Sequence, residues 1–367
     1  MLYELLYPLR EYISGLNIMG YISFRSAAAA ITALLISFFL GPPIIRALRR
    51  NHIGETIRIE GPESHQVKAG TPTMGGLIIH LAVFIPTILW ADLSNRYVLL
   101  MMFVTLWMGV IGFIDDYLKV VKKLKKGLVA RYKLMGQVIL GLIVAAFMYI
   151  YPTDAELITV TSLPFLKNVM INFGIFYIPF IILYITGFSN AVNLTDGLDG
   201  LASGLMALAA FSMLAIAYLS GRVDFSQYLG ILYLPKAGEL TVFLSAMVGG
   251  LVGFLWFNSR PAEIFMGDTG SLAYGAALGT IAILLKKEIV FLLVGMVFIV
   301  EAASVVMQVG WFRHTRKRYG EGRRIFRMAP LHHHFEELGW PESKVVIRFW
   351  ILGIFCALMS LATFKVR

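Results

Sequence analysis

The chain has little of two things that soluble proteins normally carry, charged residues and cysteine. Only 15% of its 367 residues are charged, 58% are hydrophobic, and the mean hydropathy is +0.75. Because soluble domains carry about a quarter charged residues, this composition excludes a soluble globular enzyme, a disordered chain and a coiled coil. The single cysteine, Cys356, excludes a disulfide framework and any zinc or iron–sulfur site built on cysteines.

The charge that remains is unbalanced, with 32 Lys and Arg against 22 Asp and Glu. Nucleic-acid binders are also basic, but they lack repeated apolar runs of about 20 residues, long enough to cross a bilayer. We therefore expect a lipid bilayer and no nucleic acid as partner. The sequence predicts one all-α polytopic membrane domain over residues 1–367, with about ten transmembrane helices. The expected spans are 26–41, 72–91, 97–117, 134–150, 173–189, 199–219, 238–257, 269–285, 289–311 and 345–364.

The connections between these spans predict the orientation, because cytoplasmic loops carry an excess of Lys and Arg. One set of connections holds 21 basic residues and the opposite set holds 10. We therefore expect both termini to be periplasmic, with residues 1–25 as an interfacial segment. The turn Lys286-Lys287-Glu288 is an exception, since it places two lysines on the outer side. The predicted cytoplasmic loops are 42–71, 118–133, 190–198, 258–268 and 312–344.

The unusual acidic residues all fall on the predicted cytoplasmic side, and the outer loops contain nothing comparable. Asp115 and Asp116 end one span, and Asp268 begins another. A helix dipole disfavours anions at its C-terminus, and burial in a bilayer adds to the cost. A divalent cation would offset both effects, and Mg²⁺ prefers carboxylate oxygens and substrate phosphates. Alternatively, the aspartate pair is solvated at the interface and paired with Lys119 or Lys122.

Two more aspartates, Asp196 and Asp199, lie in the glycine-rich segment at the start of the span 199–219. They either join the same acidic site or cap a helix. The segregation of these acids predicts an active site on the cytoplasmic face.

Phosphate-binding elements are expected beside the acids. Thr71 and Pro72 resemble the N-cap and first turn of a helix, and helix N-termini attract phosphate. Lys68 precedes them, Lys119 lies one turn after Asp115, and Lys133 precedes the next span. The basic loop from Lys119 to Lys133 either reaches the acids, or it fixes the membrane topology and attracts anionic lipid. Acids, helix N-termini and lysines together suit phosphoryl transfer.

Three consecutive histidines, His332, His333 and His334, lie in the last predicted cytoplasmic loop. A zinc site needs ligands that converge on a tetrahedron, and three neighbours in sequence rarely do so. Donors to a pyrophosphate fit better, and a polar loop without a role is the alternative.

These motifs together resemble the polyprenyl-phosphate N-acetylhexosamine-1-phosphate transferases, over essentially the whole chain. The resemblance is narrowed to the branch that uses a muramoyl-pentapeptide donor by residues 61–65, 70–76 and 328–334. The motifs that carry it are Asp115-Asp116, Asn193-Leu194-Thr195-Asp196-Gly197-Leu198-Asp199-Gly200, Phe265-Met266-Gly267-Asp268 and His332-His333-His334.

The resemblance implies the reaction: UDP-N-acetylmuramoyl-pentapeptide and undecaprenyl phosphate, with Mg²⁺, give the first lipid intermediate of peptidoglycan and UMP in the bacterial inner membrane. It implies that Asp268 binds the metal and that the catalytic residues are Asp115, Asp116, Asp268 and His332. A homodimer is one expectation for the assembly. The residues expected to bind substrate are Lys68, Lys119, Lys133, Asn193, Asp196, Asp199, Asn258, Phe265, His333 and His334, with Phe265 stacking on uracil.

Direct attack by the lipid phosphate and a two-step route through a phospho-aspartate both remain open at the level of sequence. Other classes also remain. A related hexosamine-1-phosphate transferase shares the acids but should lack the pattern 330–334. A secondary transporter would have polar residues at the membrane midplane, and a structural scaffold explains none of the clustered acids.

Overall fold

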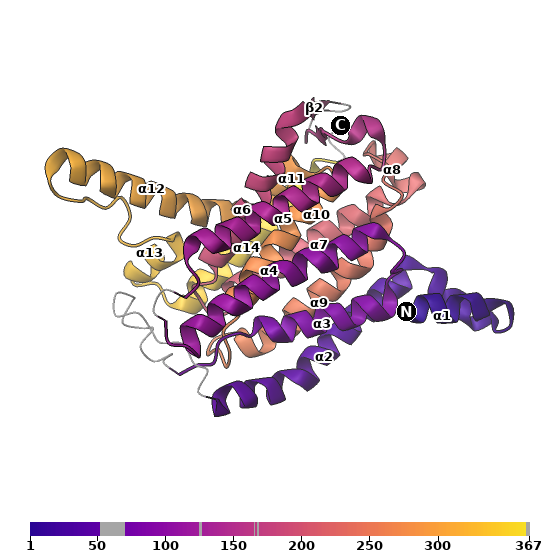
Figure 1. Ribbon diagram of the computed structural model, residues 1–367, viewed down its shortest axis with the longest axis horizontal. Coiled ribbons are helices and arrows are strands. Elements are labelled where there is room, and N and C mark those ends of the chain that lie inside the picture. The colour runs from indigo at the N-terminus through magenta and orange to yellow at the C-terminus, as the bar shows by residue number, and fades with distance from the viewer. Residues whose placement is uncertain (52–69, 125–126, 165, 167–168, 365–367) are drawn as a thin grey trace.

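A bundle of long helices makes up most of the computed structural model, which describes residues 1–51, 70–124, 127–164, 166 and 169–364 (Figure 1). Each of the ten expected spans has a helical counterpart. These counterparts are α2 (Ile22–Arg50), α3 (Gly76–Trp90), α4 (Arg96–Val120), α5 (Ala130–Ile150), α6 (Tyr177–Thr195), α7 (Leu201–Ser220), α9 (Leu240–Asn258), α10 (Gly267–Leu284), the pair α11 (Glu288–Val294) and α12 (Met296–Tyr319), and α14 (Glu342–Ala362).

Eight helices of the described residues are long and apolar enough to cross a membrane, so the chain is a multi-pass membrane protein. The helices α3 and α10 are not among them. Helix α3 has 15 residues. Helix α10 is rich in glycine and threonine, and its residues from Thr269 to Leu284 are all buried by other helices. A helix that protein surrounds on all sides need not be as apolar as one that faces lipid, so the sequence count of ten stays a prediction.

Several helices extend into segments that the sequence predicted as loops. Helix α2 continues through Pro42 and Pro43 to Arg50, α6 continues to Thr195, and α12 continues to Tyr319. The expected span 289–311 is broken at Gly295, between α11 and α12. Hydropathy marks only the part of a helix that lies in hydrocarbon, so polar turns beyond it were missed.

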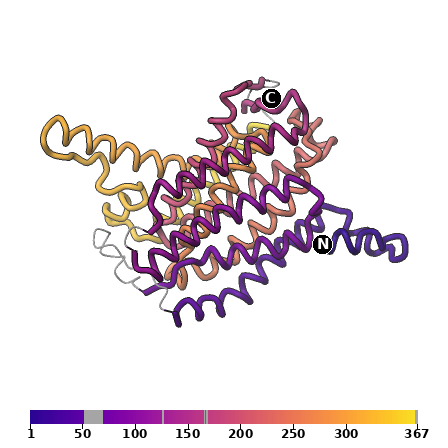
Figure 2. Tube along the Cα trace, viewed as in Figure 1, coloured from indigo at the N-terminus to yellow at the C-terminus, as the bar shows by residue number. Residues whose placement is uncertain are grey.

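Helix α10 is the centre of the bundle and positions the candidate site. It packs against α4 and α6, while α9 packs against α2, α3 and α7. Helix α12 leaves the bundle, and the chain turns back at its far end before α13 (Leu331–Glu337), as Figure 2 shows. The remaining helical segments are α1 (Leu2–Leu6), η1 (Tyr7–Glu11), η2 (Ser14–Gly20), η4 (Ala155–Leu157), η5 (Gly174–Phe176), α8 (Val223–Leu229) and η6 (Ala237–Glu239).

One small sheet departs from the all-α prediction. Strand β1 (Val160–Ser162) pairs antiparallel with β2 (Met170–Asn172), with Thr161 opposite Ile171. β-branched residues favour such a strand, but a search for long apolar runs overlooks a three-residue pair. Two buried charged residues of the turn after α10, Lys287 and Glu288, hold this sheet in place. Lys287 Nζ donates to Ser162 Oγ at 2.9 Å, and Thr161 donates to Glu288.

Candidate active site

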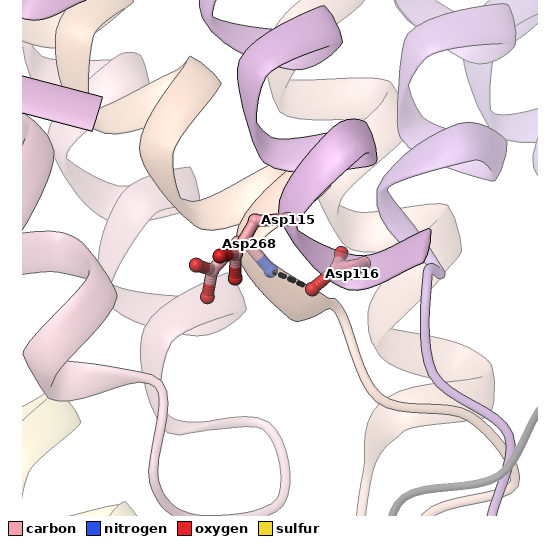
Figure 3. Close-up of side chains that lie close together, drawn as sticks. All are labelled: Asp115, Asp116 and Asp268. Atoms are coloured by element: carbon pink, nitrogen blue, oxygen red, sulfur yellow. Dashed lines mark hydrogen bonds between the residues drawn. The ribbon is translucent and has the colours of Figure 1, made fainter. Parts of the chain in front are cut away.

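Three aspartates from two helices form the only cluster of potential metal ligands found in the described part of the chain. Asp115 and Asp116 lie near the end of α4, and Asp268 is the second residue of α10. One carboxylate oxygen from each lies within 4.8 Å of the others. Asp115 is fully buried and Asp116 is 3% exposed. Figure 3 shows Asp115 and Asp268 side by side, with Asp116 turned toward the start of α10. The sequence prediction that these acids gather at one site is therefore borne out in the geometry.

Two glycines allow α4 and α10 to approach closely enough for this. A Cβ on Gly112 would lie 2.2 Å from the backbone oxygen of Asp268. Gly267 has a φ of +73°, which favours glycine, and a Cβ there would lie 2.5 Å from Asp116 Oδ2. The contact of the two helices thus sets the spacing of the carboxylates.

Asp116 caps the N-terminus of α10. Its carboxylate accepts hydrogen bonds from the backbone nitrogens of Asp268 (3.1 Å) and Thr269 (2.9 Å) and from Thr269 Oγ1 (2.7 Å). The sequence predicts that a metal offsets the unfavourable negative charge at the end of α4. The positive end of the α10 dipole supplies part of this compensation instead, so Asp116 fixes the position of Asp268.

Two lysines neutralise the other two acids. Lys133 Nζ lies 2.9 Å from Asp115 and 2.6 Å from Asp268. Lys119 Nζ lies 2.5 Å from Asp115 and 3.4 Å from Asp268. Asp115 also accepts from the backbone nitrogen of Leu128 at 2.7 Å. The prediction that Lys119 and Lys133 reach the acids agrees with this geometry, because each ammonium group lies close to both Asp115 and Asp268.

Asn193 belongs to the same cluster, although the sequence placed it in a loop. It lies in the last turn of α6, and its Nδ2 donates to Asp268 Oδ1 at 2.9 Å and to Ser271 Oγ at 2.8 Å. The amide therefore orients the Asp268 carboxylate. Asp196 follows at the C-cap of α6 and is half-buried.

The segment after Lys68 has a different structure from the one predicted. Helix α3 begins at Gly76, so Thr71 and Pro72 are not its first turn. The backbone of this segment pairs with the segment before α10. The backbone amide of Phe265 donates to the carbonyl of Pro72 at 2.8 Å. The backbone carbonyl of Phe265 accepts from the amide of Gly75, also at 2.8 Å. Phe265 is half-buried beside the site, while Lys68 lies outside the described residues.

Two predicted substrate-binding residues hold the neighbouring loops together. Asn258 is 3% exposed; it donates to the carbonyl of Ile264 at 2.9 Å and accepts from Ser203 Oγ, also at 2.9 Å. Asp199 accepts from the amide of Ala262 at 3.2 Å and donates its own amide to Glu342 at 2.8 Å. Their expected contacts with a nucleotide stay predictions.

The three histidines each have a different hydrogen-bond partner, although the ring centroids of His332 and His333 lie only 4.2 Å apart. His332 Nδ1 lies 2.9 Å from Glu301 Oε2 in α12, and His333 Nδ1 lies 2.8 Å from Glu336 in the same short helix. His334 Nδ1 accepts from the backbone nitrogen of Arg327 at 3.1 Å. His332 alone of the three is buried, at 1% exposed.

Comparison with known proteins places the chain in a family. Residues 98–286, just over half of the chain, match the model of Glycosyl transferase family 4. Residues 68–79 match the Phospho-N-acetylmuramoyl-pentapeptide-transferase signature 1. The chain is 52% identical to the Phospho-N-acetylmuramoyl-pentapeptide-transferase of Chloroherpeton thalassium, 53% to that of Gemmatimonas aurantiaca and 52% to that of Thermodesulfovibrio yellowstonii, each over 100% of both chains. The chain belongs to this transferase family.

Membership of the phospho-N-acetylmuramoyl-pentapeptide-transferase family confirms the resemblance that the sequence motifs indicated. The comparisons give no support to the expected homodimer. They also leave the roles of individual site residues open, so those roles rest on the geometry above.

Sequence reasoning missed three residues that build the candidate site. Thr269 donates twice to Asp116, Gly112 sets the helix spacing, and Glu301 holds His332. Glu301 alone left a signal, because an acid inside the apolar run 289–311 requires a partner.

Proposed function

We propose that the chain transfers phospho-N-acetylmuramoyl-pentapeptide from UDP-N-acetylmuramoyl-pentapeptide to undecaprenyl phosphate, releasing UMP. The site faces the cytoplasm of a bacterial inner membrane, because the connections beside the acids hold most of the Lys and Arg. The observation that carries the proposal is the close approach of the Asp115 and Asp268 carboxylates, both of which contact Lys119 and Lys133.

A divalent cation fits this donor set. Oxygen ligands from carboxylates are those that Mg²⁺ prefers, and it commonly keeps substrate phosphates in its shell. Asp268 would hold the ion together with Asp115, while Asp116 stays engaged with the start of α10. The ion would neutralise the charge that develops on the pyrophosphate.

The charged groups of the site itself explain why a cation is needed there. Three carboxylates and two ammonium groups leave an excess of one negative charge, which would repel two anionic substrates. A divalent ion reverses that sign. Lys119 and Lys133 can then turn from the acids to substrate phosphates, because both side chains are partly exposed.

The reaction we propose is a single displacement. An oxygen of the lipid phosphate forms a bond to the β-phosphorus, the bond from that phosphorus to the bridging oxygen breaks, and UMP leaves with the bridging oxygen. A phosphate monoester has a second pKa near 6, so the nucleophile needs little help from a base. Asp115 accepts a hydrogen bond from the Leu128 amide and would also share the cation with Asp268, which disfavours Asp115 as an attacking nucleophile.

The test is Mg²⁺-dependent release of UMP by the purified full-length protein. We expect release with the muramoyl-pentapeptide donor and polyprenyl phosphate, none with UDP-N-acetylglucosamine, and none when the lipid is omitted. Asp268→Asn should reduce release by at least 100-fold, because a charged ligand is lost at the metal, without loss of the folded state. No release from the muramoyl donor would refute the assignment. Retention of configuration at a chiral β-phosphorus would refute the single displacement.

A further inference from the structure

Glu301 is a buried acid that the reaction above does not use. It lies in the apolar first half of α12, and its side chain has no exposed surface. An ionised carboxylate in such a place is costly unless it is paired. Both of its oxygens turn to one residue of another helix: Oε2 to His332 Nδ1 at 2.9 Å, and Oε1 to the backbone nitrogen of His332 at 3.2 Å.

This pairing fixes which way the imidazole faces. A carboxylate only accepts hydrogen bonds, so the hydrogen on Nδ1 points at Glu301 and Nε2 points the other way. Among the described residues His332 Nε2 has no hydrogen-bond partner, although it is buried. Buried polar atoms are nearly always paired, so this nitrogen is free for a group that the chain itself does not supply.

The free nitrogen faces the loop at the end of α6. A Cβ on Gly197 would lie 2.3 Å from Nε2. Gly197 follows Asp196 directly, and Asn193, four residues earlier, donates to Asp268. The imidazole therefore adjoins the loop that leads to the acidic site. Buried ion pairs are weak evidence of stabilisation, so stability alone does not account for the pairing of Glu301 with His332.

We propose that Glu301 is a positioning residue that holds His332 with Nε2 presented to a phosphate group of the bound nucleotide donor. When the ring carries both protons, it donates to Glu301 at Nδ1 and to a phosphate oxygen at Nε2, and the Glu301 charge balances the buried cation. The proposal rests on the proposed function, because it assigns His332 to that donor.

The first test is Glu301→Gln in the purified full-length protein. Glutamine keeps the shape and one acceptor oxygen but removes the charge. We expect kcat for UMP release to fall about 10- to 100-fold, as when a carboxylate behind a functional histidine is removed, with KM for the donor changed less than threefold. Glu301→Asp, which keeps the charge, should recover part of kcat.

The deciding measurement is a double-mutant cycle with His332→Gln. If Glu301 acts through His332, Glu301→Gln should lower kcat less than threefold further in the His332→Gln background. A merely structural role would lower kcat equally in both backgrounds. The matched control is Glu239→Gln, a buried carboxylate that pairs with Arg25 Nη2 at 3.0 Å near the start of α9. It should lower thermal stability and leave kcat unchanged.

Gly197→Ala covers the case in which Glu301→Gln does not fold. It pushes on Nε2 from the other side while Glu301 stays intact, and kcat should fall at least 10-fold. An inactive wild-type protein would refute the proposed function and the inference together. An active wild type with near-normal Glu301→Gln and Gly197→Ala variants, or an additive cycle, would overturn this inference alone.

Discussion

Gly112 offers the sharpest test of how the helix contact controls the chemistry. In Gly112→Ala the new methyl group would lie 2.2 Å from the backbone oxygen of Asp268 and 2.5 Å from its carbonyl carbon. Side-chain carbons are essentially never found within 3.0 Å of such atoms. The backbones of α4 and α10 must therefore separate by roughly 0.8 Å or more, since neither can relax as a flexible side chain would.

That separation acts directly on the carboxylates. Asp115 lies three residues after Gly112 in the same helix, and Asp268 is the residue that the methyl group pushes away. A misplacement of about 1 Å at a reacting centre can cost about 100-fold in rate. Overpacking costs about 1–3 kcal/mol of stability. We expect kcat/KM for UMP release to fall about 100-fold while the protein remains folded.

Two other glycines separate misplacement from general damage. Gly141→Ala overpacks the backbone of Ile182 at 2.8 Å, well along α5 from Lys133. Gly279→Ala lies in α10, but its nearest neighbour would be an ordinary 3.5 Å away. Gly141→Ala should lose stability with a small change in rate, and Gly279→Ala should keep both. A Gly112→Ala variant within threefold of wild type, or a Gly141→Ala variant that is equally slow, would refute the reasoning.

Two further predictions concern stability. Asp116→Asn should lower the free energy of unfolding by about 2 kcal/mol, because one oxygen that accepts from the start of α10 becomes a donor and the charge is lost; an unchanged thermal midpoint would contradict the capping role. Burial lowers the pKa of Lys286, in the turn between α10 and α11, to about 8, from an ordinary value of 10.5. Between those two pH values the unfolded chain binds more protons than the folded one, so stability should rise with pH by up to about 1.4 kcal/mol per pH unit relative to Lys286→Met. Parallel pH profiles of the two proteins, from denaturation in detergent, would disprove this.

The sequence predicted the helical bundle and the gathering of the acids because both leave local signals. Apolar runs mark spans, and Asp115 and Asp268 stand out against so little charge. The capping of α10 by Asp116 left no such signal. Its partner, Thr269, lies 153 residues further along the chain, and only the packing of α4 against α10 brings them together.

Local rules also gave wrong boundaries near the site. Thr71 and Pro72 have the residue types of a helix start, but their segment pairs with the backbone before α10 instead. Asn193 follows an apolar run and was placed in a loop, yet the helix continues because its side chain gains Asp268 and Ser271 as partners. In both cases contacts between distant segments outweighed local preference.

The two lysines of the turn Lys286-Lys287-Glu288 show why counting charges is weaker than locating them. They lie at the end of α10 opposite to Asp268, where the orientation rule predicts few basic residues. Lys286 is 3% exposed and donates to the carbonyl of Ile158 at 2.7 Å, and Lys287 is fully buried. Basic residues that are enclosed by protein and hold a strand pair do not face the membrane surface. Excluding them from the outer count makes the bias of Lys and Arg toward the acidic site stronger, which supports the cytoplasmic orientation proposed for it.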